Sequence, residues 1–280
     1  MTAPPKTVSM LTAMRMKPMA LMMIGVVTVG GSAGCNHGSK VFDAPEVADC
    51  GGPPVSGLRL VTWNIRWAVE SSLDRIVEVL SSQGADVIAL QEVDRVTPRS
   101  DGVDQAEEIA RRLGMTSTFA AARSEGTGDF GIAILSKLPF IGAERRELPG
   151  GFAFEPRVAL DGRVCVGPGE SVRVATVHAD IYPWSRQENL RSLARTTADS
   201  VGGGVIIAGD FNDTPDGPST RLFEAGGLMR ANSPVQPTFA TSVIDHVFVD
   251  EAMVIADTTV VDSDASDHRP VVVDLERRER

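Results

Sequence analysis

Asparagine, aspartate, glutamate and histidine recur at the C-terminal ends of short apolar runs in this sequence. They are Asn64, Glu92, His178 with Asp180, Asp210 with Asn212, Asp245 with His246, and Asp267 with His268. In layered α/β folds, functional groups concentrate where strands end and loops begin. No cysteine belongs to these groups, and carboxylate and amide oxygens suit hard cations such as Mg²⁺, Mn²⁺ or Ca²⁺. The pattern therefore predicts a site for a divalent cation.

The elements that must position these residues are short buried strands alternating with helices. Apolar runs that suit strands occupy residues 58–65, 86–93, 131–136, 172–179, 205–208, 243–249 and 270–275. Apolar residues three and four positions apart predict a helix around residues 73–80, and a mixed amphipathic stretch predicts another over 186–200. Only 5% of the residues are aromatic, so Val, Ala, Leu and Ile must form most of the core. These features favour a layered α/β domain.

The charge balance limits how the protein could hold a polyanion. The formal net charge of the 280-residue chain is -10 at pH 7. A module that binds nucleic acid through bulk electrostatics needs clustered lysine and arginine, which this composition disfavours. A metal-dependent hydrolase needs only local positive charge, and its metal-binding carboxylates make it acidic by count. A nuclease therefore stays compatible with the charge.

The first 35 residues have the layout of a signal peptide. Lys6, Arg15 and Lys17 precede the apolar run 19–29, which is shorter than the roughly 20 residues of a membrane-spanning helix. The segment 32–35, Ser-Ala-Gly-Cys, resembles a bacterial lipobox that would leave Cys35 to carry lipid. Ser32 stands where an aliphatic residue is usual, so plain secretion is the alternative. We expect an exported protein, either a cell-surface or periplasmic lipoprotein or a secreted one.

Residues 36–56 are polar, rich in glycine and proline and without periodicity, and we interpret them as a flexible tether. The folded domain should then span 57–280. Cys50 and Cys165 remain after Cys35, and disulfides persist in exported proteins. The two can form a disulfide or serve as small unpaired core residues. No obligate protein partner is evident.

Five runs in order resemble the endonuclease/exonuclease/phosphatase superfamily, over nearly all of residues 57–275. They are LVTWNI at 60–65, IALQEV at 88–93, ATVHAD at 175–180, IAGDFND at 207–213 and SDHRPV at 266–271. The resemblance implies a four-layer α/β sandwich, in which two mixed β-sheets pack face to face with helices outside. It also implies metal-assisted attack of water on phosphorus.

The resemblance implies specific roles for the polar residues. Glu92 would be the principal metal ligand, with Asn64 beside it and Asp267 able to reach the metal. Asp210 and Asn212 would position the attacking water and the scissile phosphate, and a spacing of two on an extended segment would point both the same way. An Asx-turn leading into Thr214 is the structural alternative for this pair.

Two histidines and an arginine complete the implied site. His268 would contact the phosphate and assist proton transfer, with Asp245 orienting its ring. His178 resembles the second histidine of the deoxyribonuclease and sphingomyelinase branches, and Arg157 resembles an arginine near the phosphate. A solvated strand-end charge is the alternative for Arg157. His246 should point to the opposite side of its strand and be structural.

Two departures from the family pattern bear on the substrate. Arg66 stands where some members carry an acidic residue two positions after the asparagine, and Ile132 replaces an asparagine in the run 129–137. Lipid-active relatives often carry an apolar hairpin for membrane contact. The nearest candidate here is segment 150–154, with Phe152 and Phe154.

Three classes of function follow. The first is an exported phosphodiesterase or nuclease acting on nucleic acid, which the paired histidines favour. The second is a phospholipid or sphingomyelin phosphodiesterase, or a phosphatase, with the same core. The third is a binding protein on an inactive scaffold, which is disfavoured because every polar position of the core motifs is filled.

Overall fold

The computed structural model describes residues 50–150, 155–200, 203–232 and 236–278. The predicted signal peptide with Cys35 and most of the predicted tether lie outside the described residues, as do Phe152 and Phe154. None of the described helices combines the length and the apolar character that crossing a membrane requires.

Two mixed sheets of six strands form the centre of the domain. The first has the strand order β11-β12-β1-β2-β4-β3, with bounds Met253–Val260, Val271–Arg277, Gly57–Asn64, Val87–Arg95, Gly128–Ser136 and Thr116–Glu125. The second has the order β5-β6-β7-β8-β10-β9, with bounds Phe140–Glu147, Val158–Gly167, Glu170–His178, Val205–Asp210, Asp245–Val249 and Met229–Arg230.

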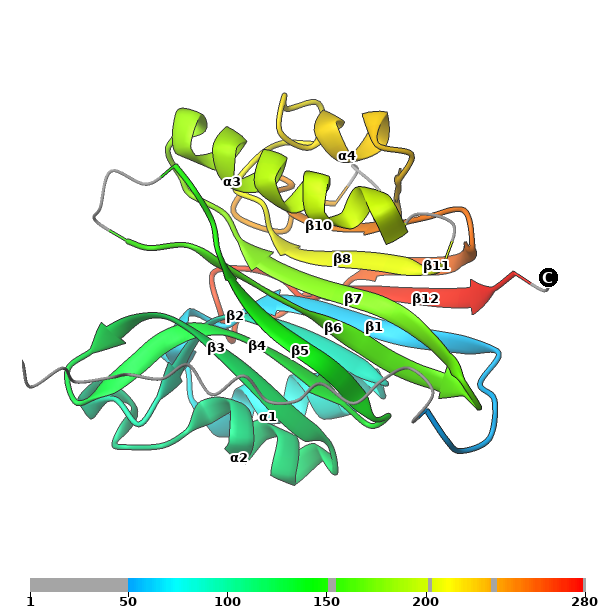
Figure 1. Ribbon diagram of the computed structural model, residues 1–280. Helices are drawn as coiled ribbons and strands as arrows, with labels where there is room; N and C mark the ends of the chain where they lie inside the picture. Colours follow the sequence, from blue (N-terminus) through cyan, green and yellow to red (C-terminus); the bar gives the residue numbers. More distant parts are fainter. Residues whose placement is uncertain (1–49, 151–154, 201–202, 233–235, 279–280) are drawn as a thin grey trace, which may run out of the picture. The chain divides into compact units, whose positions relative to one another are not determined.

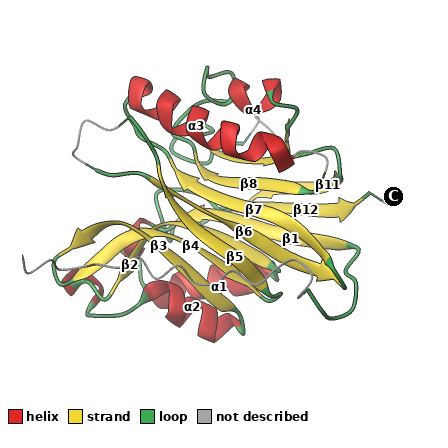
Figure 2. Ribbon diagram, in the orientation of Figure 1, coloured by secondary structure: helices red, strands yellow, loops and turns green. Residues whose placement is uncertain are grey.

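Helices cover the outer face of each sheet, as Figures 1 and 2 show. In that view α1 (Leu73–Gln83) and α2 (Gln105–Leu113) lie below the strands. Above them lie α3 (Pro183–Thr197) and α4 (Arg221–Ala225). Short 3₁₀ turns occur at Arg66–Ala68, Pro98–Ser100 and Ala198–Ser200. The layers run helix, sheet, sheet, helix, which confirms the predicted four-layer sandwich.

Alternation along the strands builds the core, because successive strand residues face opposite sides of a sheet. Leu58 and Leu60 of β1 join the apolar cluster between the sheets, together with Ile206 of β8. Val61 and Trp63 face the other way and pack with α1 and α2. Strand β1 is therefore covered on both faces, as its continuous apolar run requires.

Helix α1 shows why the local sequence begins and ends this element where it does. The hydroxyl of Ser72 accepts a hydrogen bond from the backbone N–H of Arg75, and Gly84 ends the helix at φ 66°. A helix needs such partners for its unpaired terminal groups, and a left-handed terminal residue favours glycine. Between these caps, Ile76, Val77 and Leu80 are buried against the sheet.

Several elements were missing from the expectations drawn from sequence. Strands β3, β5 and β11 lie at sheet edges and are partly exposed, so they carry no continuous apolar run. Strand β6 is interrupted by Asp161 and Arg163, and the buried Asp161 forms an ion pair with Arg173 of β7. Helix α2 was also missed.

Of the two alternatives for Cys50 and Cys165, the structure has the disulfide, with Cα atoms 5.2 Å apart. It fastens the start of the described chain to β6. Nearby, the backbone N–H of Val55 donates to the carbonyl of Val166, and that of Arg277 donates to the carbonyl of Ser56. The last seven residues assigned to the tether are thus held against the domain. A disulfide in this position is consistent with export.

Candidate active site

The strand topology brings the predicted polar residues to one edge of the sandwich. Strand β1 runs parallel to β2, and β7 runs parallel to β8, so their C-terminal ends lie together. Asn64 ends β1, while His178 and Asp210 end β7 and β8 and are register partners. Strand β10 is antiparallel to β8, which places its first residue, Asp245, opposite Asp210. Residues far apart in sequence therefore meet here.

Glu92 reaches this edge because β2 is irregular. The pairing of β2 with β4 shifts between Gln91 and Val93, and Glu92 itself has φ 55°. A bulge inserts one residue into a strand and redirects its side chain, often beside an active site. Without it, strict alternation would turn Glu92 to the helix-covered face, whereas here Val93 takes that direction into the core.

Gly209 fixes the approach of β8 to β7. A Cβ atom at this position would lie 2.1 Å from the carbonyl oxygen of Val177. The glycine of the GDFN run is therefore required for close backbone contact, which in turn sets Asp210 against His178.

His268 and Asp245 form a buried pair. The Nδ1 atom of His268 lies 2.9 Å from Oδ2 of Asp245, and the ring packs 4.6 Å from that of Phe239. Burial lowers the pKa of His268, but the charge and hydrogen bond of Asp245, together with Asp210 and Asp267, outweigh it and raise the pKa to about 9. His268 is therefore an imidazolium at neutral pH, with its second N–H directed at Asp210, 3.7 Å away.

Asp210 lies at the centre of the site. Its Oδ2 is 3.6 Å from Nε2 of His178 and 3.7 Å from Nε2 of His268. Burial, followed by repulsion from Asp245, raises the pKa of Asp210 to about 7. A carboxyl group with such a pKa is suited to accept a proton near neutral pH.

His178 is neutral, in contrast to the charged His268. Burial, followed by the charges of Arg157 and His268, holds its pKa well below the ordinary value, so its imidazole is neutral. Nη1 of Arg157 lies 3.1 Å from Nδ1 of His178, and a guanidinium can only donate. Nδ1 is therefore the acceptor and the proton is on Nε2. That N–H points toward Asp210 and Glu92.

Asn64 connects Glu92 with Asp210 by donating a hydrogen bond to each. Its side-chain NH₂ donates to Glu92 at 2.9 Å and to Asp210 at 3.1 Å, while its amide oxygen accepts from the backbone of Arg66. In this arrangement the nitrogen of Asn64, not its oxygen, faces the carboxylates.

Asn212 differs from its expected geometry. Strand β8 ends at Asp210, and Asn212 has φ 50°, so the two do not share an extended segment. The backbone N–H of Asn212 donates to Oδ1 of Asp210, which is the Asx-turn alternative, and its side chain donates to the carbonyl of Ala179. The structure still keeps Asn212 at the edge, beside the end of β7.

The acidic centre fits a cation. Asp210, Asp245 and His268 have potential ligand atoms within 4.8 Å of one another, a group that could hold a metal ion if His268 gave up a proton. Burial raises the pKa of Glu92, and Oδ1 of Asp245 has no hydrogen-bond partner among the described residues. Asp267, which carries an ion pair with Arg66 at 3.2 Å, adds another carboxylate. Buried carboxylates with unused oxygens have the donor chemistry of a hard-cation site.

Comparison with known proteins identifies the fold. The sequence profile of the Endonuclease/Exonuclease/phosphatase family matches residues 61–268. The chain belongs to this family. It has the phosphoesterase fold of the family with a buried cluster of aspartate and histidine. No match was found among curated proteins.

Several solved structures share the architecture of this chain. An endonuclease/exonuclease/phosphatase from Beutenbergia cavernae is 26% identical, with a TM-score of 0.65 over 80% of this chain and 72% of that one. The human Nocturnin catalytic domain with bound sulfate is 20% identical, with a TM-score of 0.66 over 80% and 94%. A mannosyl-6-phosphatase from Bacteroides thetaiotaomicron is 19% identical, with a TM-score of 0.61 over 78% and 99%.

One feature of this family member was missed in the sequence. Ile181, Tyr182 and Trp184 follow His178 at the start of α3 and are exposed by 59%, 63% and 59%. The apolar run Ile-Tyr-Pro-Trp could have indicated it, since exposed apolar residues in a group mark interaction surfaces. The loop is fixed beside the site, because Asp180 accepts hydrogen bonds from the Tyr182 backbone and the Ser185 hydroxyl.

His246 faces the opposite side of β10 from Asp245. Its ring lies among Phe211 and Phe248, and its Nε2 is 2.8 Å from the carbonyl oxygen of Asp213. Burial lowers the pKa of His246 from 6.5 to about 4.

This shift predicts acid sensitivity of the fold. Below pH 6.5 the unfolded chain protonates His246 while the folded chain does not until about pH 4, so stability present above pH 6.5 is lost as the pH falls. The contribution is about 3 kcal/mol. We expect His246→Phe to reduce the dependence on pH of the free energy of unfolding, measured with urea at neutral and acidic pH. If the free energy of unfolding of the variant depended on pH as strongly as that of the wild type, His246 would not be the source of the acid sensitivity.

Proposed function

We propose that this protein is an exported, divalent-metal-dependent phosphodiesterase that cleaves nucleic acid. The observation that carries the proposal is the convergence of His178 and His268 on buried Asp210, with Arg157 behind His178. The N–H groups of the two histidines lie 3.6 and 3.7 Å from the carboxylate of Asp210. Two N–H donors beside a carboxylate that can accept a proton match what hydrolysis of a phosphate ester requires.

The geometry suggests how the residues divide the work. Asp210, with its raised pKa, orients the attacking water and receives its proton. The imidazolium of His268, held by Asp245, and the neutral N–H of His178 stabilise negative charge that grows on the phosphoryl oxygens. Arg157 fixes His178 in the tautomer that donates. We assign substrate contact to Arg157, His178 and Asn212, which all lie at this edge.

We assign the cation to Glu92, with Asn64 and Asp267 as further ligands, and Mg²⁺ as the ion, with Mn²⁺ or Ca²⁺ as alternatives. The bound ion would supply Lewis-acid polarisation of the phosphoryl group. Ligation by the oxygen of Asn64 requires its amide to turn from the donor orientation described above. The neighbouring group of Asp210, Asp245 and His268 could hold an ion only with His268 in its neutral form, which would exclude the imidazolium role given to it above.

A substrate panel tests both the chemistry and the preference. We expect the full chain to hydrolyse plasmid DNA or single-stranded oligonucleotide faster than sphingomyelin vesicles or inositol polyphosphate in Mg²⁺ or Mn²⁺. The exposed rings of Tyr182 and Trp184 beside His178 support nucleic acid, because aromatic side chains stack on bases. Exhaustive chelation should abolish turnover of every substrate, since the carboxylate cluster then lacks its cation.

The results of the panel test the metal dependence and the substrate preference separately. Full activity after chelation would rule out the metal-dependent mechanism. Efficient turnover of sphingomyelin or inositol polyphosphate with intact nucleic acid would instead support the second candidate, a lipid phosphodiesterase or a phosphatase. The exposed Ile181 and the similarity to a mannosyl-6-phosphatase favour that candidate.

We also propose that Cys35 carries a lipid that holds the exported protein at the membrane. The lipobox-like segment and the disulfide support this location. Cys35→Ala should then move the protein from the membrane fraction to the soluble fraction of its host. Unchanged fractionation would show that the protein is not anchored through Cys35.

A further inference from the structure

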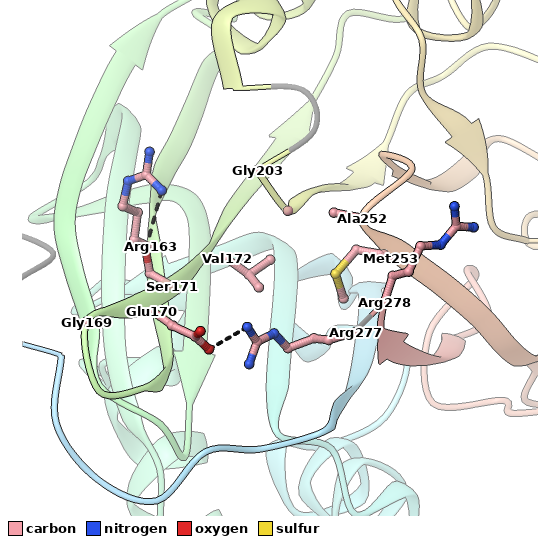
Figure 3. Close-up of a pocket in the computed structure, with 11 residues that line it drawn as sticks. Arg163, Gly169, Glu170, Ser171, Val172, Gly203, Ala252, Met253, Arg277 and Arg278 are labelled. Atoms are coloured by element: carbon pink, nitrogen blue, oxygen red, sulfur yellow. Dashed lines mark hydrogen bonds and ion pairs between the residues drawn. The ribbon is translucent and has the colours of Figure 1, made fainter. Parts of the chain in front are cut away.

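A cavity of about 220 Å³ lies between β6, β7 and the end of β12. Arg163, Arg277 and Arg278 line it, with Glu170 as the one carboxylate among its lining residues. Figure 3 shows Arg277 reaching across to Glu170, with Arg163 and Arg278 on opposite sides. Three cations against one anion give this cavity a positive balance in a chain whose net charge is -10.

Much of the hydrogen-bonding capacity of these arginines is unused. Arg277 donates to Glu170 at 2.6 Å and reaches the carbonyl of Val55 at 3.4 Å. Arg163 has a single long contact, 3.4 Å to the hydroxyl of Ser171. For the side chain of Arg278, the described part of the chain provides no hydrogen bond or ion pair. Each guanidinium carries five N–H donors that match a phosphate group.

The cavity lies at the opposite end of the sandwich from the catalytic edge. Val172 lines it near the start of β7, whereas His178 ends that strand, and Gly204 lines it just before β8, which ends at Asp210. Six residues of strand separate the two ends, or about 20 Å. A ligand here therefore cannot be the phosphate under attack.

The N-terminal part of the chain joins the domain at this same end. Cys50 is bonded to Cys165, and its carbonyl accepts a hydrogen bond from the backbone N–H of Gly169, a residue that lines the cavity. The described chain therefore begins at the cavity end of the domain.

We propose that the cavity lined by Arg163, Arg277 and Arg278 is a second anion site, which binds a phosphate-bearing group. The long side chains of Arg163 and Arg278 point outward in Figure 3 and would turn inward to donate charge-assisted hydrogen bonds, and a volume of about 220 Å³ would admit a small phosphate ester. The group is either a free phosphate ester or the headgroup of an anionic lipid at the membrane surface. The site is independent of the catalytic chemistry proposed above.

Amide shifts in ¹H–¹⁵N spectra of the full chain test the site, because they show where a ligand binds. Glycerol 3-phosphate should shift the amides of Gly169, Gly203 and Gly204 separately from those of the catalytic edge. The double variant Arg163→Gln/Arg278→Gln should weaken binding at these glycines by at least about tenfold. The matched control Arg75→Gln/Arg111→Gln removes the same charge from exposed positions of α1 and α2 and should bind as the wild type does.

Two further arms identify the source of the phosphate. In the first arm, the proteins are sedimented with phosphatidylglycerol vesicles. If the wild type and the control sediment with the vesicles and the Arg163→Gln/Arg278→Gln variant does not, the site binds lipid headgroups. If glycerol 3-phosphate binds at the site but the variant sediments with the vesicles as the wild type does, the site binds soluble phosphate esters. Equal shifts from chloride at matched ionic strength, or shifts that persist in the Arg163→Gln/Arg278→Gln variant, would overturn the proposal. Phosphodiester turnover should be unchanged in both double variants.

Discussion

Replacing Asp210 by asparagine should lower kcat for bis-p-nitrophenyl phosphate by a factor of about 10² or more. Asparagine keeps the shape of the side chain but cannot accept a proton from the attacking water. Asp210 is buried, and its pKa of about 7 suits proton transfer near neutral pH. His268→Gln should cause a loss of similar size, since it removes the imidazolium that Asp245 holds in place. Steady-state kinetics at saturating Mg²⁺ measure both effects.

The control for this experiment is a carboxylate outside the site. Asp216 is exposed and pairs with Arg221, so Asp216→Asn should leave kcat unchanged. Circular dichroism and the unfolding midpoint establish that each variant is folded. Turnover near the wild-type rate in folded Asp210→Asn or His268→Gln would refute the proposed roles of these residues.

Loss of the disulfide should have the largest effect on stability. Cys50 and Cys165 are 115 residues apart, and a cross-link of this span restricts the unfolded chain strongly. In the chain-entropy account, removing it costs about 5 kcal/mol, within the usual range of about 2–5 kcal/mol for native disulfides. We therefore expect Cys50→Ala/Cys165→Ala to lower the free energy of unfolding by this amount, measured by urea denaturation.

Reducing the disulfide of the wild-type protein provides a comparison with the double variant. A thiol reductant should destabilise the wild-type protein to about the level of the double variant and leave the double variant itself unchanged. Equal stability of the oxidised wild type and the double variant would mean that the disulfide does not stabilise the fold.

Short-range patterns in the sequence determined the family, the layered fold and the central strands. Most central strands are buried on both faces and appear as apolar runs, and the polar residue that ends such a run stands out against it. Strand β6 is the exception, because Asp161 and Arg163 interrupt it. Asn64, His178 and Asp210 were found in this way. The edge strands β3, β5 and β11 were not, because a partly exposed strand has no such contrast.

Tertiary structure decided the features that depend on contacts between distant residues. The bulge at Glu92 lies in the pairing with β4, a strand about 40 residues further along the chain. The turn at Asn212 is local, and the structure chose it over the extended alternative through the hydrogen bond to Asp210. Neither irregularity has a signature in the apolar pattern. The choice between a disulfide and two unpaired cysteines also depended on the distance between Cα atoms of Cys50 and Cys165, which spacing along the chain does not contain.

The protonation states likewise belong to the folded protein alone. The orienting role of Asp245 favoured an imidazolium at His268, but the sequence did not show that His178 would be neutral. His268 gains a proton because it faces Asp245, and His178 loses one because it is buried against Arg157. Burial and neighbouring charge set a pKa, and both exist only after the strands have brought these residues together.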